Sequence, residues 1–430
     1  MPNSRYTPLR RWGPDWRRLV IRQLTHLQAG EITLVDGTKT RTYGRATSDC
    51  PLRATVTVLD PRFYRIIAWR GTTGSGEAFM DGLWTCDDLT ALMRILLRNE
   101  AVMNRIDYRL ASLLAPIDRL LHAFRRNTVN GSRKNIAAHY DLGNEFYSLF
   151  LDETLAYSCG IFDTPETTLV QASRNKFDRI CAKLQLTSAD HLLEIGTGWG
   201  GLAIHAARHY GCRVTTTTIS REQFDLAVAR IAEAGLTDRI TVLLADYRDL
   251  TGRYDKVVSV EMIEAIGAEY YETFFRTCAT LMRPEGLLLI QAITFPDQVF
   301  ERARLEVDFI KRYIFPGCCI PSVKAMNDAV CSSSDMRMVN AEDITPHYAL
   351  TLRHWRRRFF DNLPAIRALG YSESFIRMWE YYFCWCEAGF TERYIGDVQL
   401  LYARPMSRHV PFLPPVHVWQ SHAISTMAGH

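Results

Sequence analysis

Residues 191–202, His191-Leu-Leu-Glu-Ile-Gly-Thr-Gly-Trp-Gly-Gly-Leu202, predict a strand that runs through a glycine-rich turn into a helix. The apolar stretch His191–Ile195 has the length of a buried strand, and Gly201–Tyr210 has helical spacing. The turn contains three glycines that allow sharp bending and close approach to a ligand: Gly196, Gly198 and Gly200. In open α/β folds such a turn lies at the carboxyl edge of a parallel sheet, so we expect a ligand site there.

The same glycines also fit the G-x-G-x-x-G pattern of dinucleotide-binding folds. Two features favour S-adenosylmethionine (SAM) over NAD(P). Glu194 precedes the first glycine by two residues, where a carboxylate can face the cationic amino group of a methionine moiety. The next predicted strand, residues 212–219, ends in Thr218 and its neighbours and lacks the acid that usually binds an NAD ribose. Plain strand–helix packing remains the structural alternative.

Two more polar residues follow the next strands. Asp246 closes the predicted strand 240–246, where its carboxylate could accept a hydrogen bond from an adenine amino group. Capping of the loop is the alternative role for Asp246. Gln223 lies one turn into the helix after strand 212–219 and could bond the ribose hydroxyls in place of the missing acid.

Strands and helices alternate from residue 191 onward, which predicts a doubly wound, Rossmann-like α/β fold. The predicted elements are strand 191–195, helix 201–210, strand 212–219, helix 220–235, strand 240–246, strand 255–260, helix 268–282 and strand 286–294. Residues 296–345 interrupt this series with prolines, and we expect the insertion to cover a substrate. Helices near 346–368 and 371–388 and a strand over Asp397–Ala403 complete the prediction.

Residues 1–124 predict a smaller α+β domain for lipid binding or dimerisation. Ala54–Leu59 and Tyr64–Ala68 have the period of strands, Gly71–Gly76 is expected to be a turn, and Asp87 and Asp88 are expected to cap a helix. The domain boundaries follow from composition: a polar linker over 125–135, a catalytic domain over 136–405, and a tail over 406–430.

The composition excludes several classes of site. The 430 residues carry a net charge of +4 and eleven cysteines, an odd number without repeated C-x-x-C pairs, so we expect reduced thiols and no metal site. No apolar run reaches the ~18 residues of a spanning helix. Arginines gather in segments that could contact nucleic acid or anionic lipid, or could simply be solvated. These segments are residues 1–30, 125–134 and 353–358.

Two carboxylates, Glu261 and Glu264, follow the predicted strand 255–260 and would lie at the mouth of the ligand site. The turn lacks both the Asn/Asp-Pro-Pro-aromatic motif of amino-methylating DNA enzymes and the Pro-Cys pair of base C5-methylators. An aromatic segment that includes Tyr140 precedes the fold, and its rings could stabilise a cation or belong to the core. Because the turn after strand 255–260 lacks both motifs of DNA and base methyltransferases, we expect no nucleic acid partner.

Six motifs in order carry a family resemblance: HYDLGNEFY, LDETLAYSCGIF, LLEIGTGWGGLA, TISREQ, SVEMIEAIG and HYALTLRHW. Together they resemble the cyclopropane-fatty-acyl-phospholipid synthase family, which includes the mycolic acid cyclopropane synthases. The stretch GSGEAFMDGLWTCDDL resembles the N-terminal domain of the bacterial phospholipid enzymes. The resemblance covers residues 55–405.

The resemblance implies a SAM-dependent methyltransferase fold and the transfer of a methylene group to the cis double bond of an unsaturated acyl chain in a membrane phospholipid. SAM would be held by Tyr157 and Ser158, together with the glycine turn and Gln223. A bicarbonate ion would act as base on the carbocation. By motif its ligands fall on Cys159, Glu264, Gln291 and Tyr348, with Gln291 standing where many members have His.

The chemistry of an alkene agrees with this interpretation. An alkene is a poor nucleophile, so the enzyme must align the sulfonium methyl with the double bond in a dry pocket. The enzyme does not need a Ser-His-Asp array, because no base activates the alkene. Anions and rings around the cation, such as Glu264, Tyr348 and Tyr140, suit that reaction. We expect a cytoplasmic enzyme at the inner face of the membrane, and a homodimer is implied by the resemblance. The alternatives are a methylene- or methyl-branching enzyme, a small-molecule N-methyltransferase, and a non-enzymatic lipid- or SAM-binding protein.

Overall fold

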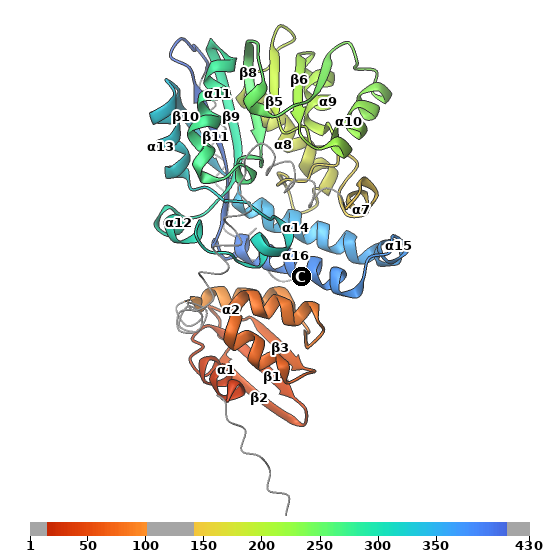
Figure 1. The fold of residues 1–430 in the computed structure, drawn as a ribbon, viewed down its shortest axis with the longest axis vertical. Coiled ribbons are helices and arrows are strands. Elements are labelled where there is room, and N and C mark those ends of the chain that lie inside the picture. The colour runs from red at the N-terminus through yellow and green to blue at the C-terminus, as the bar shows by residue number, and fades with distance from the viewer. Residues whose placement is uncertain (1–14, 101–141, 411–430) are drawn as a thin grey trace, which may run out of the picture. The chain divides into compact units, whose positions relative to one another are not determined.

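The computed structural model describes residues 15–100 and 142–410, which form two compact units (Figure 1). The predicted linker 125–135, Tyr140 and the tail beyond residue 410 lie outside the described residues.

The smaller unit is an α+β fold built on a four-stranded sheet of order β2-β1-β3-β4. Its strands are β1 (Gly30–Asp36), β2 (Lys39–Arg45), β3 (Arg53–Val58) and β4 (Trp84–Cys86). Its helices are α1 (Trp16–Leu24), α2 (Arg62–Met80) and α3 (Leu89–Arg98). The Asp88 carboxylate accepts a hydrogen bond from the Ala91 amide at 2.8 Å and caps α3 as predicted.

The prediction of a strand over Tyr64–Ala68 and of a turn over Gly71–Gly76 is wrong, because both segments belong to α2. Tyr64, Ala68 and Gly71 are buried at helical spacing. A short apolar run of this length is compatible with either a helix or a strand. Gly71 has φ +53° and ψ −131°, so the helix continues through the glycine-rich segment with a kink there.

The larger unit contains a seven-stranded mixed sheet of order β10-β11-β9-β8-β5-β6-β7. The strands are β5 (His191–Ile195), β6 (Arg213–Thr218), β7 (Ile240–Leu244), β8 (Tyr254–Val260), β9 (Met282–Thr294), β10 (Arg337–Asp343) and β11 (Gly396–Ala403). Strands β5 to β9 pair in parallel, and β11 is antiparallel to both β9 and β10. The chain order reverses between β5 and β8, which is the position where doubly wound sheets bind ligands. The predicted fold class is confirmed.

Helices cover both faces of this sheet (Figure 1). One core packs α11 (Tyr271–Leu281) and α13 (Val323–Ser333) on the sheet, and the other packs α8 (Leu169–Lys183) and α9 (Gly201–Tyr210). The remaining helices are α7 (Asn144–Ser148), α10 (Arg221–Glu233), α12 (Asp297–Ala303), α14 (Thr345–Asp361), α15 (Leu363–Ala368) and α16 (Glu373–Thr391). Single turns of helix are η2 (Tyr247–Asp249), η3 (Ile263–Ala265), η4 (Ala268–Tyr270) and η5 (Ile310–Ile314).

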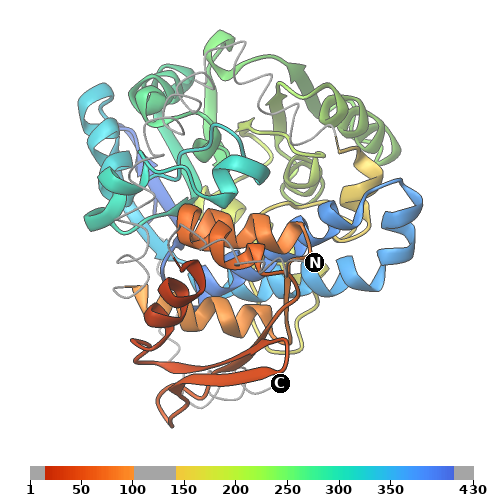
Figure 2. The same ribbon diagram turned by 60° about the horizontal axis from the view of Figure 1, so that its bottom comes forward.

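Helices α14 and α16 lie side by side in both views (Figures 1 and 2). The ring of Tyr348 on α14 stacks on that of Phe390 on α16 with centroids 4.2 Å apart. The segment 296–345 contains α13 and the edge strand β10, neither of which the sequence predicted. Strand β10 has no buried residue, so it lacks the apolar pattern by which strands are recognised.

Within residues 15–100 and 142–410, no helix combines the length and the hydropathy needed to cross a membrane.

Candidate active site

A cavity of about 310 Å³ lies at the carboxyl ends of β5, β6 and β8. Most of the sequence-predicted site residues line it: Tyr157, Ser158, Glu194, Gly196, Gly198, Thr218, Gln223, Asp246, Glu264 and Tyr348. Gly200, Cys159 and Gln291 do not line the cavity, although Cys159 and Gln291 contact a residue that does. The cavity thus brings together residues far apart in the sequence.

The glycine turn after β5 forms one wall of the cavity. Gly196 and Gly198 have φ +106° and +52°, conformations that a residue with a Cβ adopts only with strain. An added Cβ at Gly198 would meet no atom of the described part of the chain within 4 Å. Gly200, with φ +83°, precedes the first residue of α9 and shapes the start of that helix.

The Glu194 carboxylate lies at the base of the turn. It is 4% exposed and accepts a hydrogen bond from the Thr216 hydroxyl at 2.6 Å. Burial raises the pKa of Glu194 to about 8. A cationic amino group beside it would favour the ionised carboxylate, as the sequence hypothesis requires.

Two polar side chains border the far side of the same wall. The Thr218 hydroxyl donates to Gln223 Oε1 at 2.9 Å, which orients the amide and turns its nitrogen away from Thr218. Asp246 lines the cavity and also caps η2, because its carboxylate accepts from the Arg248 amide at 3.0 Å and from the Arg248 guanidinium at 2.7 and 2.8 Å. Asp246 therefore caps η2 and also lines the cavity, and its contact with an adenine amino group stays a prediction.

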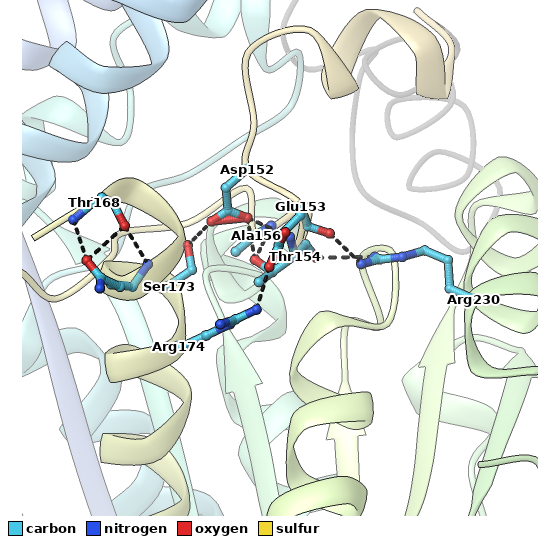
Figure 3. A network of polar contacts seen from close by, with 9 residues as sticks. Asp152, Glu153, Thr154, Ala156, Thr168, Ser173, Arg174 and Arg230 are labelled. Carbon is cyan, nitrogen blue, oxygen red and sulfur yellow. Dashed lines mark hydrogen bonds and ion pairs between the residues drawn. The ribbon is translucent and has the colours of Figure 1, made fainter. Parts of the chain in front are cut away.

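The segment before Tyr157 is fixed by polar contacts (Figure 3). Asp152 accepts hydrogen bonds from Thr154 N at 2.8 Å, from Thr154 Oγ1 at 2.5 Å and from the Ser173 hydroxyl of α8. Arg230 of α10 donates to the carbonyls of Glu153 and Thr154 at 2.8 and 3.2 Å. These contacts anchor the segment to two helices, so Tyr157 and Ser158 are presented to the cavity from a fixed loop.

Lys176, a cavity residue that the sequence analysis missed, contacts this loop. Its ammonium donates to Ser158 Oγ at 2.6 Å, and its side chain is fully buried. Burial lowers the pKa of Lys176, and nearby acids such as Glu261 and Asp152 oppose that shift. The available signal was a lysine on the apolar stripe of α8, between Ala172 and Ile180.

Glu264 on η3 lies opposite the glycine turn. Its Oε1 accepts from the Ile293 amide at 2.5 Å, whereas its Oε2 is buried and has no hydrogen-bond partner among the residues that the structure describes. Burial, followed by repulsion from Glu261, raises the pKa of Glu264 to about 8. Without a ligand this carboxyl is largely protonated at neutral pH, and a cation in the cavity would favour its ionised form.

Glu261 accepts hydrogen bonds from three separate segments, although sequence analysis gave it no defined role. Its Oε1 accepts from the Cys159 amide at 2.9 Å and from Gln291 Nε2 at 2.7 Å. Its Oε2 accepts from the Tyr348 hydroxyl at 2.5 Å. Its backbone has φ +49°, a strained conformation for a residue other than glycine.

Cys159 and Gln291 lie behind the cavity wall. The Cys159 side chain is fully buried, its Sγ contacts the Gly160 carbonyl at 3.2 Å, and burial raises the pKa of the thiol. The thiol is therefore protonated and is not a nucleophile. Both residues act toward the cavity only through the bonds that they donate to Glu261.

The remainder of the cavity is apolar and aromatic. Its lining includes Ile310, Phe315, Leu352, Trp385 and Phe390, drawn from the 296–345 segment, α14 and α16. The ring centroid of Tyr157 lies 5.2 Å from that of Trp355 and 6.3 Å from that of Phe315. One cavity thus joins a glycine turn and several acids to a hydrophobic wall that can accommodate an alkyl chain.

Comparison with known proteins agrees with this geometry. The family model described as mycolic acid cyclopropane synthetase matches residues 128–400. Tuberculostearic acid methyltransferase UfaA1 of Mycobacterium tuberculosis is 39% identical over 391 residues, 89% of each chain. Cyclopropane-fatty-acyl-phospholipid synthase of Escherichia coli strain K12 is 36% identical over 354 residues, 82% of this chain and 88% of the relative.

Among solved structures, mycolic acid cyclopropane synthase CmaA1 in complex with SAH and CTAB is 30% identical. It superposes with a TM-score of 0.59 and covers 63% of this chain and 98% of that one. The family resemblance inferred from the sequence motifs is confirmed by these matches. The chain therefore belongs to the mycolic acid cyclopropane synthetase family and is a SAM-dependent enzyme of the methyltransferase fold.

Proposed function

We propose that the protein transfers a one-carbon unit from SAM to the cis double bond of unsaturated acyl chains in membrane phospholipids and forms a cyclopropane ring. The observation that carries the proposal is the single cavity in which the glycine turn, the acids Glu261 and Glu264, and an apolar wall meet. A sulfonium methyl at the turn would face an alkene held by that wall, in a site from which side chains exclude water.

The chain's own residues supply what such a reaction requires. The rings of Tyr157 and Tyr348 line the cavity, and the carboxylates of Glu261 and Glu264 would lie near a carbocation formed there. No residue is needed to activate the alkene. The remaining requirement is a group that accepts one proton.

Most of the residues expected to hold a bicarbonate base already donate hydrogen bonds within the protein. Of the four residues expected to hold it, Cys159, Gln291 and Tyr348 already donate to the Glu261 carboxylate. These residues therefore do not fit an additional anion at the same place.

Action at the inner face of the membrane is part of the proposal. Its support is the match to the phospholipid enzyme of Escherichia coli and the basic N-terminal segment. The cluster 353–358 contributes little, since Arg353 and Arg356 pair with the buried Glu387 at 3.0 Å and Arg358 donates to the Phe150 carbonyl at 3.0 Å.

A methylene- or methyl-branched product is a second candidate. It is favoured by the relative UfaA1, which is named a methyltransferase and matches this chain at higher identity and coverage than the Escherichia coli synthase. Both products would share the methyl transfer to the alkene and differ in how the cation is resolved.

Expression in a bacterial strain that lacks its own cyclopropane synthase, with methyl-deuterated methionine in the medium, tests the proposal. We expect a new acyl species that retains two of the three deuteria and resists catalytic hydrogenation. A species with the same label that takes up hydrogen would identify the branching reaction. No new acyl species from folded, SAM-binding protein would contradict both.

A further inference from the structure

The Glu261 carboxylate occupies the centre of a ring of hydrogen-bond donors. A backbone amide, a carboxamide and a phenol donate to its two oxygens at 2.5–2.9 Å. Three donors from three separate segments suit an anion at this point, and none of them carries charge. Glu261 also lines the cavity and is only partly buried, so the carboxylate is within reach of a ligand.

A buried chain of bonds fixes the orientation of the Gln291 amide. The ammonium of Lys183 can only donate, and it donates to Gln399 Oε1 at 2.9 Å. Gln399 Nε2 therefore donates to Gln291 Oε1 at 3.0 Å, which leaves Gln291 Nε2 to donate to Glu261 at 2.7 Å. Lys183 thus fixes, through Gln399, the amide orientation in which Gln291 donates a hydrogen bond to the Glu261 carboxylate.

The neighbouring acids are arranged differently. Asp397 lies fully buried behind Gln291 and does not line the cavity. Burial and the nearby Glu261 and Glu264 raise its pKa well above the usual range, which favours the neutral form of this carboxyl. Glu264 lines the cavity but receives a single backbone hydrogen bond, whereas Glu261 receives three bonds from three separate segments.

These donors are also the positions that the family resemblance assigns to bicarbonate. A second anion could not take the bonds that Cys159, Gln291 and Tyr348 give to Glu261, and it would be repelled at close range by the carboxylate. The strained backbone of Glu261, with φ +49°, is a further sign that the side chain is held at this point for function.

We propose that Glu261 is the catalytic base of this enzyme, a carboxylate built into the chain in place of bound bicarbonate. The inference rests on the proposed function. SAM is consumed as a substrate: its C–S bond breaks with the electron pair left on sulfur, the alkene π pair forms a C–C bond, and a carbocation remains on the neighbouring carbon. A C–H bond of the transferred methyl then breaks, its electron pair closes the ring, and Glu261 accepts the proton.

Two substitutions test the role of Glu261. Glu261→Gln keeps the shape of the side chain but cannot accept the proton. Glu261→Gly removes the side chain, relieves the positive φ and leaves space among the three donors for a small anion. Glu272→Gln, at an exposed carboxylate on α11, is the matched control.

The assay is turnover on phospholipid vesicles that contain unsaturated acyl chains, in buffer freed of CO₂ and again with added bicarbonate or formate. We expect wild-type turnover to be the same in both buffers. Both Glu261 variants should lose at least ~100-fold in kcat in CO₂-free buffer, the typical contribution of a general base. Bicarbonate or formate should restore activity to Glu261→Gly by about tenfold or more and should not restore Glu261→Gln.

SAM affinity measured by calorimetry should stay within a few fold in both variants, which shows that they are folded. A wild-type enzyme that loses activity in CO₂-free buffer and regains it with bicarbonate would overturn the role of Glu261 as base but would leave the proposed function standing. Wild-type kcat in Glu261→Gln would do the same. A wild-type protein that binds SAM but modifies no acyl chain would overturn the proposed function and this inference with it.

Discussion

The two ends of the cavity are built in different ways. At the cofactor end, one continuous segment from Glu194 to Gly198 supplies the turn and its carboxylate. At the acid end, Glu261 after β8 is held by Gln291 of β9, Tyr348 of α14 and the amide of Cys159. The first end depends on backbone conformation over a few residues, and the second depends on long-range packing. Substitutions at the two ends should therefore separate cofactor binding from chemistry.

The largest expected effect is at the cofactor end. Gly198→Val should weaken SAM binding by at least about 100-fold and remove turnover, because a β-branched residue at positive φ is strained and its side chain would project into the cavity. Isothermal calorimetry with SAM measures the change. Gly235→Val is the matched control, since Gly235 has φ +70° with open space beyond it and lies away from the cavity. Equal loss in both variants would mean that the effect is one of folding.

At the acid end, Glu264→Gln should lower turnover by about 100-fold or more through the loss of a charge that faces the cation, while SAM affinity stays within a few fold. Parallel measurements of kcat and of SAM binding check this. Strongly weakened SAM binding would place Glu264 at the cofactor end instead.

The same variant should change how stability depends on pH. The folded-state pKa of Glu264, about 8, lies above the ordinary 4.5, so the folded state holds this proton more tightly than the unfolded state. The wild-type free energy of unfolding should therefore fall as pH rises from about 4.5 through about 8, by an amount on the order of a few kcal/mol. Thermal melts at pH 5 and pH 9 should show Glu264→Gln gaining in Tm relative to wild type at the higher pH. An unchanged difference would mean that Glu264 ionises normally.

Tyr348→Phe should lower kcat by roughly tenfold, because Glu261 loses one donor while the stacking on Phe390 is kept. Turnover and thermal melts together test this. Tyr402→Phe is the control, since the buried Tyr402 hydroxyl has no hydrogen-bond partner within residues 15–100 and 142–410 and its removal should change neither quantity. A similar loss of kcat in both variants would contradict the assigned donor role.

The smallest expected effect concerns Cys159. Its thiol is fully buried with a raised pKa, so iodoacetamide at pH 8 should leave it unmodified in the folded protein. Mass spectrometry should find the exposed Cys331 labelled in the same sample, which serves as the internal control. Labelling of Cys159 would show an open path to the acid end that this fold does not provide.

Much of the fold was predictable because its signals are local. The apolar run of β5, the glycine turn and the alternation through β9 identify the elements without reference to their neighbours. A wrong strand prediction and a missed strand both result from the lack of such a signal. The segment Tyr64–Ala68 fits both helical and strand periods, and β10 has no apolar face to reveal it.

The candidate site divides in the same way. Residues tied to the turn or to strand ends, such as Glu194 and Gln223, were found from their spacing, and the structure places them in the cavity. Lys176 escaped notice because a lysine on an apolar helix face becomes meaningful only when its hydroxyl partner is known. Glu261 was noticed beside Glu264, but its three donors come from residues 159, 291 and 348.

The sequence by itself determined the family, the doubly wound fold and the cofactor turn, because each depends on interactions between residues close along the chain. Only the tertiary structure decided which acid is surrounded by hydrogen-bond donors and which is buried with a raised pKa. Both burial and donors depend on strands and helices that are far apart in the sequence and pack together in the fold.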